Sequence, residues 1–302
     1  MRKITLIALL SVFFLANIAI ADVAPEYRVG ADKKNPKNQS NQIQKTYTGV
    51  FDVQKNTISN IDFYTSNYGI FGLDVARSLG GGVWPRGSQN QYIFGGGIWF
   101  AAKKPYKPHP DSAETMRKYV IVSYNPNSGK SWLVPGRIED GDYLNKDDIY
   151  KYRTVFSIDF KGDGTPIQAN DKYNWPIWDD SPEDTLKLNR YFGHFIYQDG
   201  MRNTTSYPKG PAFISGEDIF ATFKDTDLNY YEGGVSKMTQ YGYPLRIQFE
   251  KTIYSWGFGD YKDFIFLRYD MINKSGQDLE ECWLAPVMDV DIALTTNSRG
   301  GA

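Results

Sequence analysis

The chain has 302 residues, of which 41% are hydrophobic and 16% are aromatic, so it is long enough to bury one or two cores. Its 34 Lys and Arg residues balance 35 Asp and Glu residues, for a formal net charge of -1. This balance predicts no general attraction to nucleic acid or to an anionic membrane, and nucleic acid is excluded as an expected partner. The many Tyr, Phe and Trp residues favour β structure.

Residues 1–21 have the three-part pattern of a secretory signal peptide. A positive start at residues 2–3 (RK) leads into an apolar run at residues 4–16, and residues 19–21 (AIA) form a small-x-small cleavage site. Cleavage there would start the mature chain at Asp22. No later apolar stretch approaches the length of a membrane span. We therefore expect no span in the mature chain and a location outside the cell or on its outer surface.

The next segment, residues 22–50, is polar and has no apolar periodicity, which is typical of a flexible leader. Residues 51–302 then form one predicted β-rich domain. The chain stops at LTTNSRGGA, directly after a strong strand pattern. This ending suggests that the domain is truncated there and that the chain is a fragment of a longer protein.

Strand-like runs separated by turn signals recur throughout residues 51–302. Within residues 245–250 the odd positions are apolar and the even positions polar, which predicts a strand with one face exposed to water. Residues 273–277 (NKSGQ) have the composition of a β-hairpin turn. The other predicted strands are 92–102, 118–124, 152–160, 217–224, 264–272 and 279–292.

Helical patterns are few and short. Residues 111–119 are compatible with one or two helical turns, and residues 179–192 with a short helix capped by Ser181. Neither is long enough for the helical crossover that joins parallel strands. The sequence therefore predicts an all-β fold, an antiparallel β-sandwich or paired sheets, with long decorated loops and at most short helices.

Two triple glycines bracket an aromatic run in GGGVWPRGSQNQYIFGGG, residues 80–97. Gly82 and Gly87 have the spacing of a phosphate-binding loop, but Ser88 follows where that loop needs lysine. Pro85 also lacks a backbone N–H, and a strand pattern follows in place of a helix. We interpret the segment as a glycine-rich turn that feeds a strand, with Gly95–Gly97 marking a bulge or a close approach of another segment.

The one metal prediction concerns Asp289 and Asp291. They stand two apart in a predicted strand, so both carboxylates point to the same face, where they repel unless a cation lies between them. Ca²⁺ is the candidate cofactor, since it prefers oxygen ligands. The alternative is a solvated acidic pair. No other cofactor is expected.

Groups for nucleophilic catalysis are scarce, so no catalytic residue is assigned and an enzyme is the less favoured class. The chain has two histidines, His109 in a proline-rich loop and His194 in an apolar run, and one cysteine, Cys282. Because Cys282 lies in an apolar segment, we expect it to be buried.

Tryptophan side chains offer stacking surfaces for sugar rings. Trp175 and Trp178 in the loop WPIWD are the candidate glycan-stacking pair, although packing in the core is the favoured role for the tryptophans as a set. The others are Trp84, Trp99, Trp132, Trp256 and Trp283.

Several of these segments, taken in order, resemble a known group of proteins. They are NTISNIDFYTSNYGIFG, VWPRGSQNQYIFGGGIWFAAK, DKYNWPIWDD, GEDIFATFKDTDL and the pair of strands from Leu267 to Ile292. Their order is similar to the N-terminal region of large, mostly uncharacterised secreted proteins of bacteria that use a type IX secretion system. In the last segment, Asn273, Gly276, Asp289 and Asp291 occupy matching positions, whereas Ala293 stands where glycine is usual.

The resemblance implies export, surface display and contact with the secretion machinery, but no reaction. The C-terminal sorting domain of such proteins is absent from this sequence. We therefore expect an exported surface or extracellular protein with a structural or adhesive, binding role, whose partners include extracellular glycans or other surface proteins. The alternative is a carbohydrate-active module, either glycan-binding or glycosidase-like.

Overall fold

The computed structural model describes residues 3–6, 51–75, 77, 79–138, 152–159 and 215–290, with the backbone alone for residues 3–6. Within these residues the chain is mostly strand, in three antiparallel sheets, with one short α-helix. This confirms the prediction of an all-β fold. The predicted leader (22–50) and the predicted helix (179–192) lie outside the described residues.

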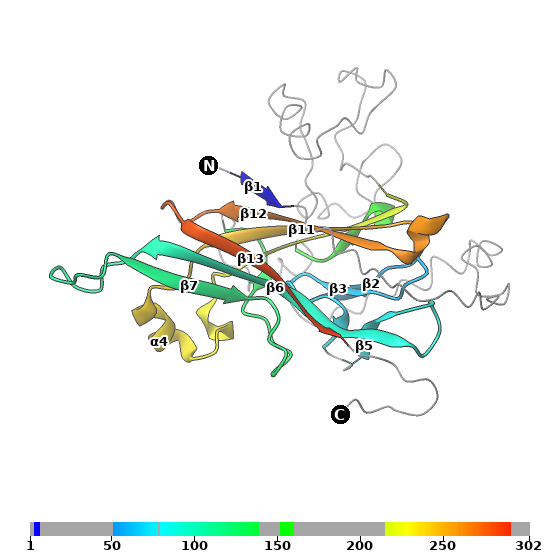
Figure 1. Ribbon diagram of the computed structural model, residues 1–302, viewed down its shortest axis with the longest axis horizontal. Coiled ribbons are helices and arrows are strands. Elements are labelled where there is room, and N and C mark those ends of the chain that lie inside the picture. Colours follow the sequence, from blue (N-terminus) through cyan, green and yellow to red (C-terminus); the bar gives the residue numbers. More distant parts are fainter. Residues whose placement is uncertain are drawn as a thin grey trace, which may run out of the picture.

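The two larger sheets form the two layers seen in Figure 1. The β11 sheet has the strand order β1-β12-β11-β10-β8, with β9 also paired to β10. Its members are β1 (Lys3–Leu6), β8 (Val134–Pro135), β9 (Val155–Phe156), β10 (Glu217–Lys224), β11 (Ile247–Ser255) and β12 (Ile265–Asn273).

The β6 sheet has the order β13-β6-β5-β4, with β7 also paired to β6. Its members are β4 (Leu73–Asp74), β5 (Leu79–Val83), β6 (Gln91–Pro105), β7 (Met116–Val122) and β13 (Glu280–Val290). The third sheet is the pair β2 (Val53–Lys55) and β3 (Tyr64–Ser66). The helical segments are α4 (Gly234–Tyr241) and the 3₁₀ turns η4 (Ser157–Asp159), η7 (Leu228–Tyr230) and η8 (Asp260–Asp263).

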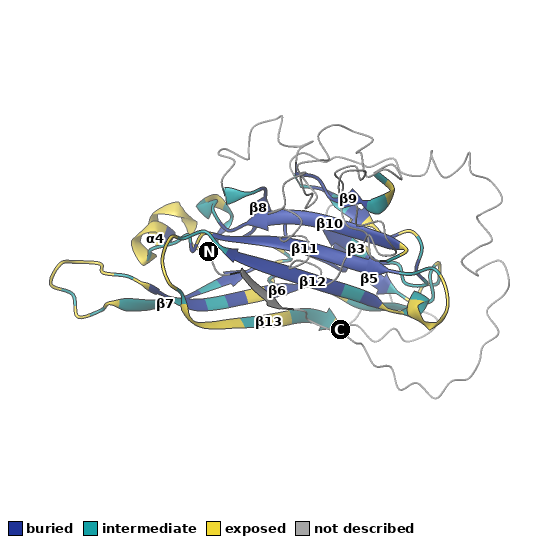
Figure 2. Cartoon of the chain, turned by 90° about the horizontal axis from the view of Figure 1, so that it is seen from above, coloured by how far each residue is buried: buried dark blue, intermediate teal, exposed yellow. Residues whose placement is uncertain are grey.

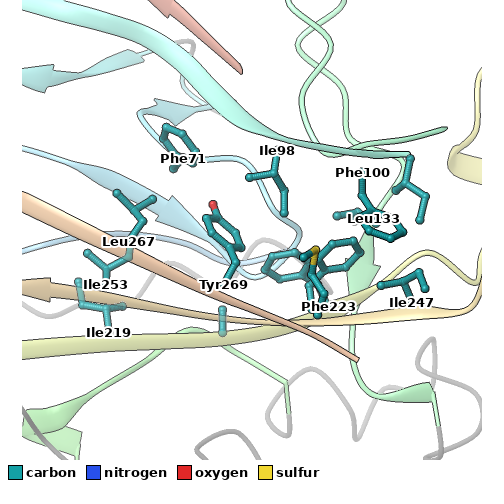
Figure 3. Close-up of a cluster of buried hydrophobic side chains, with 14 of the residues drawn as sticks. Phe71, Ile98, Phe100, Leu133, Ile219, Phe223, Ile247, Ile253, Leu267 and Tyr269 are labelled. Atoms are coloured by element: carbon teal, nitrogen blue, oxygen red, sulfur yellow. The ribbon is translucent and has the colours of Figure 1, made fainter. Parts of the chain in front are cut away.

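The main core lies between the two larger sheets. Apolar side chains from β6 and the loops beside it meet those of β10, β11 and β12 (Figure 3). Phe223 and Phe249 stack with their ring centroids 5.6 Å apart, and Phe100 approaches Phe249 edge-on at 6.4 Å. Burial of aromatic and aliphatic surface on this scale is the main force that holds the two layers together.

The triple glycine in β6 marks a close approach. A Cβ added to Gly96 would lie 2.5 Å from the Phe71 ring, and one added to Gly97 would lie 2.3 Å from the Ser123 hydroxyl. A register shift in the pairing of β13 with β6 also falls here, between Asp289 and Val290. Both alternatives predicted for Gly95–Gly97, a bulge and close packing, are therefore found.

Most predicted strands are confirmed, and residues 217–224 match β10 at both ends. The prediction of a water-exposed face at residues 245–250 is wrong, because Gln248 and Glu250 are only 3% and 7% exposed. β11 is a central strand, with neighbours on both edges, and both of its faces are covered (Figure 2). Gln248 is hydrogen-bonded to Glu250 there, as a buried polar group must be.

Two other local predictions are also wrong. The turn at residues 273–277 does not close a β-hairpin, because β12 and β13 belong to different sheets and the turn carries the chain from one layer to the other. Residues 116–119 are not helical but begin β7, which is paired with β6 from Met116 onwards. Pairing with a neighbouring strand overrides a weak local helical preference. The helix α4 was not predicted.

Candidate functional site

The residues predicted as sites are only partly within the described chain. Asp289 is half-buried on β13, opposite Gly95 of β6. Asp291, Trp175 and Trp178 lie outside the described residues. Among the residues that are described, no three His, Cys, Asp or Glu side chains gather in a way that could hold a metal ion. The calcium site at Asp289 and Asp291 therefore stays a prediction, as does glycan stacking on Trp175 and Trp178.

The cysteine and histidine groups are also placed. Cys282 is exposed, so the expectation of a buried thiol is wrong. It lies on β13, whose first half is exposed along an edge of the β6 sheet (Figure 2). His109 is in an exposed loop, with its Nδ1 atom 3.5 Å from a carboxylate oxygen of Asp111. His194 is outside the described residues.

Asp225, the most deeply buried acid with a perturbed pKa, has a structural role. Its carboxylate accepts hydrogen bonds from the backbone N–H groups of Leu245 at 2.8 Å and Ile247 at 2.7 Å, and from the Tyr231 hydroxyl at 3.1 Å. Burial raises its pKa to about 6, and the backbone donors act in the opposite direction. Asp225 thus ties the end of β10 to the start of β11 and has no open face for a substrate.

A second buried acid, Glu217, anchors a loop. It accepts hydrogen bonds from the backbone N–H of Thr57 at 2.8 Å and from the Thr57 hydroxyl. Burial raises the pKa of Glu217, against the effect of these hydrogen bonds. Glu217 thus holds the loop of residues 56–62. This loop lies at the end of the sandwich where β5 ends, next to Val83.

Arg86 fixes the other side of this end. Its guanidinium donates to the carbonyl oxygens of Ser59 at 2.5 Å and Ile61 at 2.9 Å, and its Nη1 atom lies 2.6 Å from the Asp62 carboxylate. Burial lowers the pKa of Arg86, and Asp62 partly offsets this effect. The loop between β5 and β6, which carries Trp84, is therefore held firmly against residues 56–62.

At this end of the sandwich, aromatic side chains gather on the surface. They come from the β5–β6 loop, the start of β6, the turn between β11 and β12, which includes η8, and the start of β12. Figures 1 and 2 show that the backbones of these segments lie at the same end of the sandwich. We call this cluster the aromatic end. It consists of Trp84, Tyr92, Trp256, Phe258, Tyr261, Phe264 and Phe266.

The rings of the aromatic end are in two groups. In one, the centroids of Trp84 and Tyr92 are 6.5 Å apart. In the other, Trp256 lies 5.7 Å from Tyr261 and approaches Phe266 edge-on at 5.6 Å. These spacings are those of aromatic side chains in mutual contact.

Asp263 joins the two groups. Its Oδ1 atom accepts hydrogen bonds from the Trp84 indole N–H and from the Asn60 side-chain amide, both at 2.7 Å. Within the described part of the chain, its Oδ2 atom has no hydrogen-bonding partner. Asp263 thus has a spare acceptor atom and links the η8 turn to Trp84.

The aromatic end remains open to solvent despite these contacts. Phe258 is 65% exposed, Tyr261 57% and Trp84 40%. Large aromatic side chains this exposed are unusual when several lie together, and such clusters mark contact sites. The sequence named Trp84 and Trp256 among its stacking candidates but could not show that they belong to the same end of the sandwich, since the two residues are far apart in the sequence.

A second exposed pair lies on the outer face of the β6 sheet. Trp283 of β13 is opposite Ala101, and Trp99 of β6 is opposite Ala285, so the two indoles are diagonal neighbours on one face. Trp99 is anchored by a hydrogen bond from its indole N–H to the Tyr124 carbonyl at 2.8 Å, whereas Trp283 is 73% exposed. By contrast, Trp132 is buried in a cluster with Tyr231 and Met238.

Comparisons of this chain with protein-family models, with curated proteins and with solved structures gave no match. No helix in the described residues is long and apolar enough to cross a membrane.

Proposed function

We propose that this chain is an exported surface or extracellular protein with an adhesive, binding role, and that the aromatic end is its contact surface. Support for export comes from the signal-peptide pattern of residues 1–21 and from the resemblance to secreted proteins. The observation that carries the binding role is the gathering of solvent-exposed rings from two distant segments, the β5–β6 hairpin and the turn between β11 and β12, held in place by Arg86 and Asp263. A site built on anchored loops loses little conformational freedom when it binds.

Export is tested by expressing the tagged full chain in a bacterium and analysing the envelope and the medium. We expect the chain outside the cytoplasm, with an intact mass that corresponds to a start at Asp22. A chain that stays in the cytoplasm with residues 1–21 attached would refute export.

The binding role is tested with the chain starting at Asp22 and envelopes from the cells that produce it. Sedimentation with the envelopes should fall at least tenfold in the Trp84→Ala and Tyr261→Ala variants. Trp283→Ala is the matched control, because it removes an exposed tryptophan outside the aromatic end. Equal binding by all four proteins would show that the aromatic end is not the contact surface.

The alternative, a carbohydrate-active module, has one favourable observation. Several tryptophans of the described chain are exposed, as stacking on sugar rings requires. This supports the glycan-binding form. A glycosidase needs two acids that face each other across an open cleft. Glu217 and Asp225 do not supply them, because both are buried and bind backbone groups.

A further inference from the structure

We propose that the ligand of the aromatic end is an uncharged saccharide, stacked on Trp84 and Tyr261 and hydrogen-bonded to Asp263. This inference rests on the proposed function, since it identifies the ligand of the same contact surface. Three properties of the aromatic end select this ligand: its rings, its hydrogen-bond acceptor and its charge.

The rings select a ligand with flat apolar faces. A pyranose ring presents C–H groups on its faces and hydroxyl groups around its rim. The faces stack on indole and phenol rings, as other amphipathic partners do. Trp84 and Tyr261 are both exposed. Asp263 accepts a hydrogen bond from Trp84 and lies in the same η8 turn as Tyr261. The aromatic end therefore offers two exposed rings on which sugar faces can stack and a carboxylate that is linked to both of them.

The acceptor selects a ligand that donates hydrogen bonds. Asp263 uses Oδ1 for Trp84 and Asn60, and this pair of bonds fixes the plane of the carboxylate. The direction of Oδ2 is therefore set before any ligand arrives. A hydroxyl group at the rim of a stacked sugar can donate to Oδ2, and bonds to a carboxylate are stronger than those between neutral groups.

The charge excludes the other flat or amphipathic ligands. Asp260 and Asp263 lie on η8 with a single cation, Lys262. The nearby cations Arg86 and Lys55 are both paired with Asp62, and Arg86 also binds backbone carbonyls. Nucleic acids and anionic lipids need several cations for their phosphates. Glycans rich in uronate or sulfate would be repelled by the same carboxylates.

The test uses affinity electrophoresis of the chain starting at Asp22, through gels that contain a neutral β-glucan, xylan, a neutral α-glucan or heparin. We expect at least one neutral polysaccharide to retard the protein and heparin to leave it unaffected. Trp84→Ala and Tyr261→Ala should each weaken the interaction at least tenfold, and Asp263→Asn about threefold to tenfold. Trp283→Ala should be retarded like the unmodified chain. Circular dichroism of each variant shows whether it is folded.

Retardation by heparin alone, or by none of the neutral polysaccharides, would overturn the saccharide proposal. An equal loss of retardation in Trp283→Ala would also overturn it, because the binding site would then lie on the outer face of the β6 sheet. Envelopes treated with periodate, which cleaves vicinal diols of sugars, separate this proposal from the function on which it rests. Binding that needs Trp84 but survives periodate would refute the saccharide and leave the contact surface standing. Loss of binding after periodate would support both.

Discussion

Lys251 is a lysine in the hydrophobic core, and its replacement should stabilise the protein. It lies on the core-facing side of β11, opposite Ala221 of β10 and Tyr269 of β12. Its ammonium group donates one hydrogen bond, to the Ser66 carbonyl at 2.9 Å, and lies 5.7 Å from the centroid of the Phe223 ring. A charged lysine has three donors, so most of its hydration is lost without replacement.

The magnitude follows from the pKa. Burial is the cause that lowers the pKa of Lys251 from 10.5 to about 7. In the unfolded chain the lysine keeps its proton up to about pH 10.5, whereas in the folded protein it loses the proton near pH 7. The destabilisation is therefore complete below about pH 7, where it amounts to about 5 kcal/mol, and it disappears as the pH rises towards 10.5.

The assay is urea unfolding at a series of pH values between 6 and 10. The free energy of unfolding of the unmodified chain should rise by about 3 kcal/mol more than that of Lys251→Met between pH 7 and pH 10. At pH 7 the variant should be the more stable protein by about 2–4 kcal/mol, after allowance for the lost bond to Ser66. Lys237→Met, at an exposed position of α4, controls for the removal of one positive charge. Parallel pH profiles for the unmodified chain and Lys251→Met would refute the reasoning.

Three further predictions concern other parts of the fold. Gly97→Ala should lower the free energy of unfolding by about 1–3 kcal/mol in urea, because the added Cβ would overlap the Ser123 side chain. An unchanged unfolding midpoint would show that β6 and the segment after β7 move apart at little cost. A chain starting at Asp22 lacks β1, which pairs with one edge of β12. The backbone amides on that edge should therefore exchange with deuterium faster than in the full chain, and equal exchange would mean that β1 gives no protection. If Asp289 and Asp291 bind Ca²⁺, a chelator should lower the melting temperature of the unmodified chain but not that of the Asp289→Asn, Asp291→Asn variant. A melting curve that chelation leaves unchanged would remove calcium from consideration.

The fold class was predictable because it depends on local patterns. Strands such as residues 217–224 are recognised by β-forming side chains between turn signals. The absence of long helical patterns argues against parallel sheets, which need helical crossovers. The errors concern which surfaces are covered. Gln248 and Glu250 have the sequence pattern of an exposed face, but burial depends on segments that pack from elsewhere in the chain. The same reason explains Cys282, whose apolar neighbours lie on an exposed edge strand.

The candidate site was less predictable than the fold. Its parts were visible in the sequence: Trp84 and Tyr92 belong to the segment that carries the resemblance to secreted proteins, and Trp256 was one of the stacking candidates. Asp263 joins these parts, because it accepts hydrogen bonds from Trp84 and from Asn60. These two residues are 179 and 203 positions from Asp263 in the sequence. A single sequence holds no signal for such pairs. The stacking prediction accordingly went to Trp175 and Trp178, which share one loop.

The position of the aromatic end follows from how the β6 sheet is held. The hairpin of β5 and β6 carries Trp84 at its tip, and a hairpin tip alone would be free to move. Arg86 removes that freedom by binding carbonyl oxygens of residues 56–61, and Glu217 secures the same loop to the β11 sheet through Thr57. Charges taken out of water lower stability unless they are paired, and here Arg86 binds the Asp62 carboxylate and backbone carbonyls, while Glu217 binds the backbone N–H and hydroxyl of Thr57. Arg86 and Glu217 fix the loop 56–62 and the β5–β6 turn in one arrangement, and Asp263 attaches the β11–β12 turn to both through Asn60 and Trp84. These contacts explain why rings from separate segments share one exposed surface.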